Sequence, residues 1–298
     1  MAFSPLISAD VLQYNLDQGQ DVMILDCRAS LTDANAGRRA WQNAHLPQSQ
    51  YFDLHRDMAS EDSSQGRFPL PIKETFTKRL QSFGITSSQA IVLLDDAGGT
   101  LAAARAWWLL YIWAGHPNVK ILDGGLVAWR SIGGQLVDSS AKITQASCDV
   151  SAVSDWTPSY NNNQLISAEE IIARPDLRLT DARSFDRFTG KHEPLDSVAG
   201  HIPGADCRPS AFNLTNDGYF KSSKQLRQEL THRVSEVVYC GGGVAACHTI
   251  FCYYIAGLPI PKLYIGSWSH WIRDKTRPII RTTTTESDPE NMQREAKS

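Results

Sequence analysis

The second half of the chain repeats the motif order of the first half. Asp26-Cys27-Arg28 ends an apolar run, and Asp181-Ala182-Arg183 ends another at the corresponding place in the second half. Likewise, Ala44-His45-Leu46-Pro47 corresponds to Gly200-His201-Ile202-Pro203. Two copies in the same order indicate duplication of one β/α unit. The duplication predicts two similar domains, which suits a length of 298 residues.

Composition shifts give the expected domain boundaries. We expect a first domain over residues 1–140, a linker over 141–163, a second domain over 164–280 and a tail over 281–298. The linker is rich in Ser, Thr and Asn and carries few helix signals. The tail is Thr-rich and then charged, so we expect it to wrap or fray rather than form a core.

Each copy alternates short apolar runs with helical stretches. Val22–Leu25, Ile91–Leu94 and Val237–Tyr239 read as buried strands. Ser8 and Ser167 stand where each would cap the helix that opens its copy. This alternation predicts an α/β fold in which each domain is a mainly parallel sheet flanked by helices. In such sheets, binding sites form at the carboxyl ends of the strands.

Charge and composition exclude several classes of protein. The net charge is −3, so the chain offers no basic field for nucleic acid or an anionic membrane. No apolar run approaches the ~18 residues of a membrane span, and the N-terminus lacks the pattern of a signal peptide. The six cysteines form no C-x-x-C pair, so we expect neither a disulfide framework nor a structural zinc site. A reducing cytoplasm is the simplest compartment.

The strongest candidate site is the stretch from Cys240 to Ala246. Cys240 follows an expected strand, Gly241, Gly242 and Gly243 come next, and a helix can begin near Ala245. Glycines turn sharply and can direct several backbone N–H groups at one point, where the helix end adds positive potential. A thiolate, or a sulfur anion attached to it, would be stabilised there. The alternative is a buried cysteine before an ordinary strand–helix turn.

The repeat places the first-half counterpart of Cys240 at or near Asp95. A carboxylate cannot act as a sulfur nucleophile. We therefore expect the two halves to be built alike, with the thiol in the second half alone.

With these features the sequence resembles the two-domain rhodanese-like sulfurtransferases, the group that includes thiosulfate and 3-mercaptopyruvate sulfurtransferases. The resemblance spans nearly the whole chain, with its motifs in the family order. The matching motifs are Asp181-Ala182-Arg183, Arg187-Phe188-Thr189-Gly190, Gly200-His201-Ile202-Pro203-Gly204-Ala205, Cys240-Gly241-Gly242-Gly243-Val244-Ala245-Ala246-Cys247-His248 and Gly266-Ser267-Trp268-Ser269-His270-Trp271. The resemblance implies tandem rhodanese domains, an inactive first domain and a catalytic cysteine in the second that carries a persulfide.

The implied chemistry begins with attack of Cys240 on a small anionic donor of sulfane sulfur, either thiosulfate or 3-mercaptopyruvate. Cyanide or a thiol then accepts the sulfur, without a metal or organic cofactor. Arg187 is the candidate clamp for the donor, with an ion pair to Asp186 or Glu193 as its alternative role. Backbone N–H groups would stabilise the sulfur anion. They belong to Gly241, Gly242, Gly243, Val244, Ala245 and Ala246.

Two other functions would also fit a rhodanese fold. A phosphatase or arsenate reductase on this fold needs an arginine six residues after the cysteine, where this chain has Ala246. A noncatalytic sulfur carrier or regulatory module remains the alternative to an enzyme. We expect a monomer or weak oligomer with small-molecule partners, and no nucleic acid or membrane partner.

Departures from the family pattern concern the donor. Mercaptopyruvate enzymes of the family have a loop serine proposed to act with an aspartate and a histidine of the first domain. The matching positions here are Gly242, His55 and Phe68. Their second substrate arginine, after a Glu-Pro pair, is Leu195. We therefore expect measurable transfer from thiosulfate, with mercaptopyruvate turnover through water-assisted protonation.

Other residues have mainly structural interpretations. Arg183 is expected to hold the halves or a loop together, and His201 to fix a turn. Cys247 is expected to pack within its helix, with a regulatory disulfide to Cys240 as the alternative. For Trp268 and Trp271 the sequence favours neither a core position nor a place at the mouth of the site.

Overall fold

The computed structural model describes residues 4–139, 156–232 and 234–281. The linker predicted over 141–163 is thus described only from Trp156 onward. Of the tail predicted over 281–298, only Arg281 falls within the described residues.

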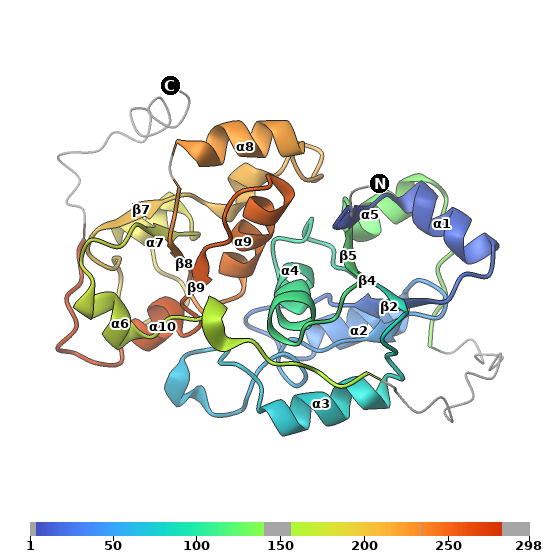
Figure 1. The fold of residues 1–298 in the computed structure, drawn as a ribbon, viewed down its shortest axis with the longest axis horizontal. Coiled ribbons are helices and arrows are strands. Elements are labelled where there is room, and N and C mark those ends of the chain that lie inside the picture. The colour runs from blue at the N-terminus through green and yellow to red at the C-terminus, as the bar shows by residue number, and fades with distance from the viewer. Residues whose placement is uncertain (1–3, 140–155, 233, 282–298) are drawn as a thin grey trace. The chain divides into compact units, whose positions relative to one another are not determined.

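The chain divides into two compact units, and each includes a short segment from the other half of the sequence. The first unit comprises the described residues within Met1–Ser63, Phe68–Gln164 and Leu214–Phe220. The second comprises those within Ser64–Arg67, Leu165–Asn213 and Lys221–Ser298. Figure 1 shows helices around a sheet in each.

The first unit contains a five-stranded sheet in the order β1-β5-β4-β2-β3, and every strand pair is parallel, as predicted. Its elements, in chain order, are β1 (Leu6–Ile7), α1 (Ala9–Asp17), β2 (Val22–Asp26), α2 (Ala36–Asn43), β3 (Gln50–Tyr51), η1 (Ser63–Gln65, grouped partly with the second unit), α3 (Lys73–Ser82), β4 (Ala90–Leu94), α4 (Ala102–Trp107), the π-helix η2 (Trp108–Trp113), β5 (Val119–Leu122), α5 (Gly125–Ser131) and η3 (Asn162–Gln164).

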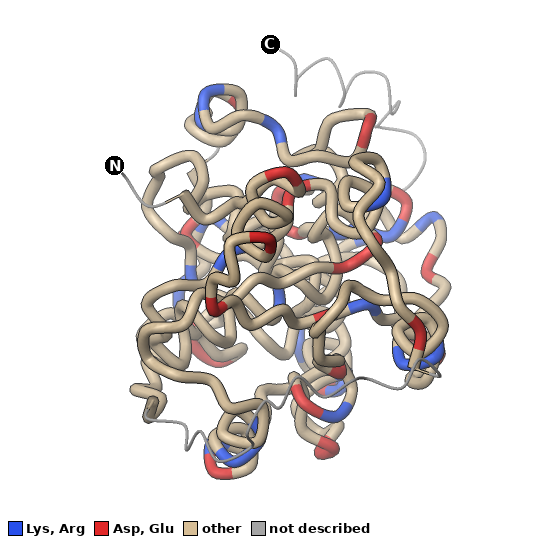
Figure 2. The backbone as a smooth tube through the Cα atoms, turned by 90° about the vertical axis from the view of Figure 1, so that its right-hand side faces the viewer, with Lys and Arg blue, Asp and Glu red and all other residues tan. Residues whose placement is uncertain are grey.

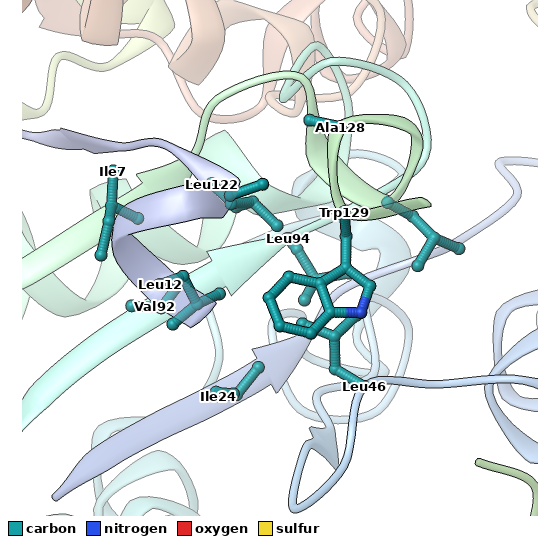
Figure 3. Packing of buried hydrophobic residues seen from close by; sticks show 11 residues of the cluster. Ile7, Leu12, Ile24, Leu46, Val92, Leu94, Leu122, Ala128 and Trp129 are labelled. Atoms are coloured by element: carbon teal, nitrogen blue, oxygen red, sulfur yellow. The ribbon is translucent and has the colours of Figure 1, made fainter. Parts of the chain in front are cut away.

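Both faces of this sheet are buried. On one face, Leu12 of α1 and Trp129 of α5 pack with Ile24, Val92 and Leu122 of the strands (Figure 3). Alternate strand residues point to the opposite face, which α4 covers through its contacts with β4 and β5. Burial on both faces explains why the strands read as continuous apolar runs rather than alternating ones.

The segment Leu214–Phe220 packs on two turns of the first unit. A Cβ on Gly99 would lie 2.8 Å from the Phe220 ring, and a Cβ on Gly124 would lie 2.6 Å from the Tyr219 ring. The Phe220 N–H donates to Asp123 at 2.9 Å. This segment therefore packs against the first unit although its sequence lies in the second half.

The second unit repeats the architecture with a parallel sheet in the order β7-β6-β8-β9. Its elements are α6 (Ala168–Ala173), β6 (Leu179–Asp181), α7 (Phe185–Thr189), β7 (Ala205–Cys207), η4 (Ser210–Asn213), α8 (Ser223–Thr231), β8 (Val237–Tyr239), α9 (Ala245–Ile255), β9 (Lys262–Leu263) and α10 (Ser267–Trp271). The predicted serine caps are confirmed, since the Ser8 and Ser167 side chains accept hydrogen bonds from the first turns of α1 and α6.

The core of the second unit shows where two tryptophans lie whose position the sequence did not decide. Trp268 and Trp271 of α10 are almost fully buried and pack with Val237, Tyr239 and Ile171. Both are core residues, so a place at the mouth of the site is wrong for either. The apolar surface that each indole removes from water stabilises the packing of α10 on the sheet.

The register of the two sheets confirms the repeat at the level of single residues. Asp26 of β2 lies opposite Leu94, and Asp181 of β6 lies opposite Tyr239. The residues that follow Leu94 and Tyr239 are Asp95 and Cys240, so these two occupy the same place in their units.

The paired motifs also make the same contacts. Arg28 binds Asp26 and the carbonyl of Ala44, while Arg183 binds Asp181 and the carbonyl of Gly200. The structural role predicted for Arg183, holding a loop in place, is confirmed. Because both ion pairs are buried and each arginine also bonds to a loop carbonyl, they hold each loop close to its strand.

Lys and Arg residues and Asp and Glu residues are scattered along the backbone (Figure 2). In the described ranges, no helix has the length and apolar character needed to cross a membrane. The same ranges contain no group of three or more His, Cys, Asp or Glu side chains placed to hold a metal ion.

Candidate functional site

Cys240 directly follows β8, an interior strand of the second sheet, as predicted. It is only 3% exposed. Its N–H donates to Ser267 Oγ at 3.1 Å, and its carbonyl accepts from the Trp268 N–H at 3.0 Å. Both partners belong to α10, so the buried tryptophans of that helix fix the backbone of the candidate nucleophile.

The glycines that follow are required by their surroundings. Gly243 has φ of +78°, and a Cβ there would lie 2.4 Å from the Ile265 carbonyl oxygen. Only a residue without a side chain fits that conformation and that approach. The Gly241 carbonyl accepts from the Ser269 N–H at 2.9 Å, so α10 also anchors this part of the loop.

Backbone donors gather where this loop meets α9. The helix begins at Ala245, and the first N–H groups of a helix have no acceptor within it. Among the described residues, no protein acceptor takes a hydrogen bond from the N–H of Gly241, Gly242, Val244, Ala245 or Ala246. The loop therefore offers unpaired backbone donors beside a thiol, which is the arrangement that the sequence predicted for binding an anion.

Arg187 lies against this loop. A Cβ on Gly241 would lie 3.0 Å from Arg187 Nη2 and 3.2 Å from Nη1. The guanidinium therefore occupies the space that a side chain at position 241 would need. The structure therefore places Arg187 next to Gly241, the residue after Cys240. In the sequence, only the family resemblance connected these two positions.

Two buried carboxylates hold the Arg187 guanidinium. Nε donates to both Glu193 oxygens at 2.9–3.0 Å, and Nη2 donates to Asp196 Oδ2 at 3.1 Å. The predicted pair with Glu193 is present but buried, whereas Asp186 is exposed and pairs with Lys191. Among the described residues, no protein acceptor takes a hydrogen bond from Nη1, which leaves this nitrogen for a ligand.

Electrostatics keep these groups charged. Burial alone would raise the pKa of Glu193, but hydrogen bonds from Arg187 and from the Leu195 and Asp196 N–H groups lower it below its usual value. Burial disfavours the charge on Arg183, yet the Asp181 carboxylate beside it raises its pKa further. Arg183 also donates to Glu193 at 3.1 Å, so Glu193 links the two arginines.

Arg67 was missed by sequence reasoning, which considered its neighbour Phe68 alone. The structure groups Arg67 with the second unit, where Nη2 donates to Asp196 Oδ1 and, at 3.3 Å, to the Leu195 carbonyl. Its backbone N–H donates to Ser269 Oγ at 2.9 Å. The signal that could have indicated it is a lone arginine after a glycine in a polar loop, which is too common a pattern to assign.

The loop at the same place in the first unit is filled by its own side chain. Asp95 Oδ1 accepts from the Ala97 N–H at 2.9 Å and the Gly99 N–H at 2.8 Å. Oδ2 accepts from the Ala103 N–H at 3.1 Å. Burial raises the pKa of this carboxyl, and the three N–H groups oppose that rise. A strand–turn–helix junction of this type therefore directs several backbone N–H groups at one acceptor group in this chain.

The other described cysteines are buried in different settings. Burial raises the pKa of the Cys27 and Cys252 thiols, which makes them poor nucleophiles. Cys247 lies in α9, fully buried as predicted, and its thiol donates to the Gly243 carbonyl at 3.3 Å. Cys148 lies outside the described residues.

The remaining predicted positions are also located. His55 and Phe68 lie together in the first unit with ring centroids 5.1 Å apart, and the His55 ring bonds to the Ser30 carbonyl. His201 fixes a turn as predicted, because its ring bonds to the Phe188 carbonyl and its backbone pairs with Ile280.

A family model, known sequences and solved structures match this chain over most of its length. The model for the rhodanese-like domain matches residues 8–132 and 166–274. A probable 3-mercaptopyruvate sulfurtransferase of Pseudomonas aeruginosa is 39% identical, covering 94% of this chain and 99% of its own. A putative thiosulfate sulfurtransferase of Mycobacterium tuberculosis is 35% identical, covering 93% and 97%. The solved 3-mercaptopyruvate sulfurtransferase of Leishmania major has a TM-score of 0.78 and 26% identity, covering 90% and 74%.

Proposed function

The chain belongs to the rhodanese-like family and is a sulfurtransferase, and from that premise we propose that Cys240 carries the transferred sulfur as a persulfide. The observation that carries the proposal is the placement of this thiol at the carboxyl end of β8, at the start of a loop of unpaired backbone donors. Asp95 supports it, because a sulfur anion on Cys240 would make contacts of the kind that its carboxylate makes in the first unit.

The reaction takes two displacements. The Cys240 thiolate attacks the sulfane sulfur of the donor, and the electron pair of the broken bond leaves with the rest of the donor, as sulfite when the donor is thiosulfate. The acceptor, cyanide or a thiol, then attacks the outer sulfur. The Sγ–S bond breaks and its electron pair returns to Cys240 as thiolate. This cycle predicts ping-pong kinetics.

The surrounding groups have separate tasks in this proposal. The unpaired N–H groups of the loop stabilise the persulfide anion, and Arg187 Nη1 binds the anionic part of the donor. Glu193 and Asp196 orient Arg187 by occupying its other nitrogens. Gly241 has no side chain, and this lets the guanidinium approach the nucleophile.

For the donor, we propose that thiosulfate is used and that mercaptopyruvate is turned over through protonation by water. Sulfite leaves without needing a proton, whereas an enolate leaving group must gain one. Gly242 and Phe68 cannot supply a proton, and the His55 ring bonds to the Ser30 carbonyl. Both donor classes appear in the names of the relatives, so the names alone do not decide between them.

Steady-state assays of the whole protein with thiosulfate and with 3-mercaptopyruvate, each with cyanide as acceptor, test this proposal. We expect measurable transfer from thiosulfate. A preference for mercaptopyruvate by several orders of magnitude would overturn the donor assignment and leave the persulfide step intact. Absence of turnover and of persulfide with both donors would favour a noncatalytic regulatory module.

A further inference from the structure

We propose that Ser267 is a positioning residue for sulfur transfer, which holds the Cys240 backbone so that the thiol faces the unpaired donors of its loop. This inference rests on the proposed function of Cys240 and adds a residue to it. Ser267 begins α10 and is fully buried. Its hydroxyl acts on the backbone of Cys240, so its role is one of position rather than catalysis.

Ser267 has a backbone conformation that residues other than glycine rarely adopt. Its φ is +53°, and Gln48 is the one other non-glycine residue with a positive φ among the residues that the structure describes. The conformation is strained for a residue with a side chain, because Cβ comes too close to the following carbonyl. Such strain persists only where the surrounding contacts hold it, and it is concentrated at functional sites.

The contacts of the Ser267 hydroxyl hold this conformation. Oγ accepts from the Cys240 N–H at 3.1 Å and donates to the Tyr264 carbonyl at 2.9 Å. Because its hydrogen is directed at Tyr264, a lone pair faces Cys240. The next residue, Trp268, donates its N–H to the Cys240 carbonyl at 3.0 Å. The start of α10 therefore holds both polar groups of the Cys240 backbone, and this fixes the direction in which its side chain leaves the chain.

The first unit contains the same turn without the hydroxyl. Gly125 occupies the place of Ser267 in the repeat, with φ of +54°, and the Leu126 N–H donates to the Asp95 carbonyl at 3.0 Å. A Cβ on Gly125 would lie 2.2 Å from that carbonyl oxygen, so no side chain fits there. Both turns thus need a residue in the left-handed conformation, and the unit with the thiol has a serine where the other has a glycine.

The difference follows from how each loop residue is held. The Asp95 carboxylate is fixed by the three backbone N–H groups that it accepts. A thiol that must react with a donor has to be held through its backbone instead. Glycine at position 267 would adopt the required φ without strain, but it has no oxygen to accept from the Cys240 N–H. The strained serine therefore fixes the nucleophile where a glycine could not.

The experiment compares Ser267→Gly and Ser267→Ala with the unmodified protein. Both variants lack the hydroxyl, but only the glycine relieves the strain, so Ser267→Gly should unfold at a higher temperature than Ser267→Ala. Persulfide formation on Cys240 is followed by mass spectrometry in a single turnover at increasing thiosulfate concentration. We expect the maximal rate to fall about tenfold or more in both variants, and the half-saturating thiosulfate concentration to change less than about threefold.

Gln48→Gly is the matched control, because it relieves strain at an exposed residue of the first unit. It should raise the temperature of unfolding and leave the rate of persulfide formation unchanged. A faster rate in Ser267→Gly than in Ser267→Ala, in step with its stability, would show a merely structural role and overturn the proposal. A loss seen only as weaker thiosulfate binding would overturn it as well. If the unmodified protein formed no persulfide on Cys240, the proposed function itself would fail, and this inference with it.

Discussion

The loops that begin at Asp95 and at Cys240 occupy the same place in two copies of one fold, and they differ in what meets their backbone donors. In the first unit, the Asp95 carboxylate accepts three backbone N–H groups. In the second unit, the N–H groups of Gly241, Gly242, Val244, Ala245 and Ala246 have no protein acceptor among the described residues. One loop therefore completes the fold from within, and the other can bind an anion from outside.

The comparison separates a property of the backbone from a property of one side chain. A strand that ends in a glycine-containing turn before a helix provides the donors in both units. Reactivity requires in addition a residue that can leave those donors free and attack sulfur. The first unit is thus an internal control for the second.

The largest effect is expected from Cys240→Ser, which removes the sulfur nucleophile and keeps the loop. Sulfur transfer should fall by about a thousandfold or more, equivalent to about 4 kcal/mol of transition-state stabilisation. Mass spectrometry after donor treatment should show one added sulfur on Cys240 in the unmodified protein and none in the variant. Full activity in the variant, or an adduct on Cys27 or Cys207 instead, would contradict the assignment.

The second prediction addresses the first unit. Asp95→Ala should lower the free energy of unfolding by about 2 kcal/mol, because three backbone N–H groups lose the hydrogen bonds that this side chain accepts. Denaturant unfolding measures the change. Asp96→Ala, at the exposed neighbouring position, should have almost no effect. Equal stability of the two variants would show that the carboxylate is not needed to satisfy the loop.

The positive charge of Arg187 lies beside the loop that follows Cys240 in the second unit. Arg187→Ala should lower kcat/KM for thiosulfate about tenfold or more, equivalent to roughly 1.4 kcal/mol. Arg187→Lys should recover little, since an ammonium group cannot bind Glu193 and Asp196 in the same planar geometry. Wild-type kinetics in Arg187→Ala would remove this arginine from the site.

The smallest effect is expected from one added methyl group. Gly241→Ala would place a Cβ 3.0 Å from Arg187 Nη2, so the guanidinium must shift, and kcat/KM should fall about fivefold, or about 1 kcal/mol. In the Arg187→Ala background, the same substitution should lower kcat/KM only slightly further. If the two losses simply add, the glycine does not act through Arg187.

Much of the fold could be predicted from the sequence because the same order of motifs occurs in both halves. The apolar runs at Ile91 and Val237 predicted parallel strands, and the structure confirms them. The two Asp-x-Arg motifs indicated the repeat, and each forms the same ion pair. The residues of the site loop follow from the cysteine and its glycines, which is local information.

What escaped prediction depends on contacts between residues distant in sequence. Nothing near Arg67 indicates that its partner is Asp196, 129 positions away. The two tryptophans at positions 268 and 271 stayed open because a pattern of aromatic residues does not distinguish a helix that packs inward from one that lines a site. The resident carboxylate in the first loop was identified only as a missing thiol, since its three acceptor bonds need coordinates to be seen.

The exchange of segments between the halves of the sequence has a consequence for how the protein is made. A chain emerging from the ribosome presents residues 68–164 well before Leu214–Phe220, the segment that covers Gly99 and Gly124. The first unit therefore cannot complete the packing over these two turns during its own synthesis. Arg67, in turn, is made long before Asp196 and Ser269, so its partners arrive late. The contacts of these two segments can form only after most of the chain exists, and expressing either half alone yields a protein that lacks part of its own unit.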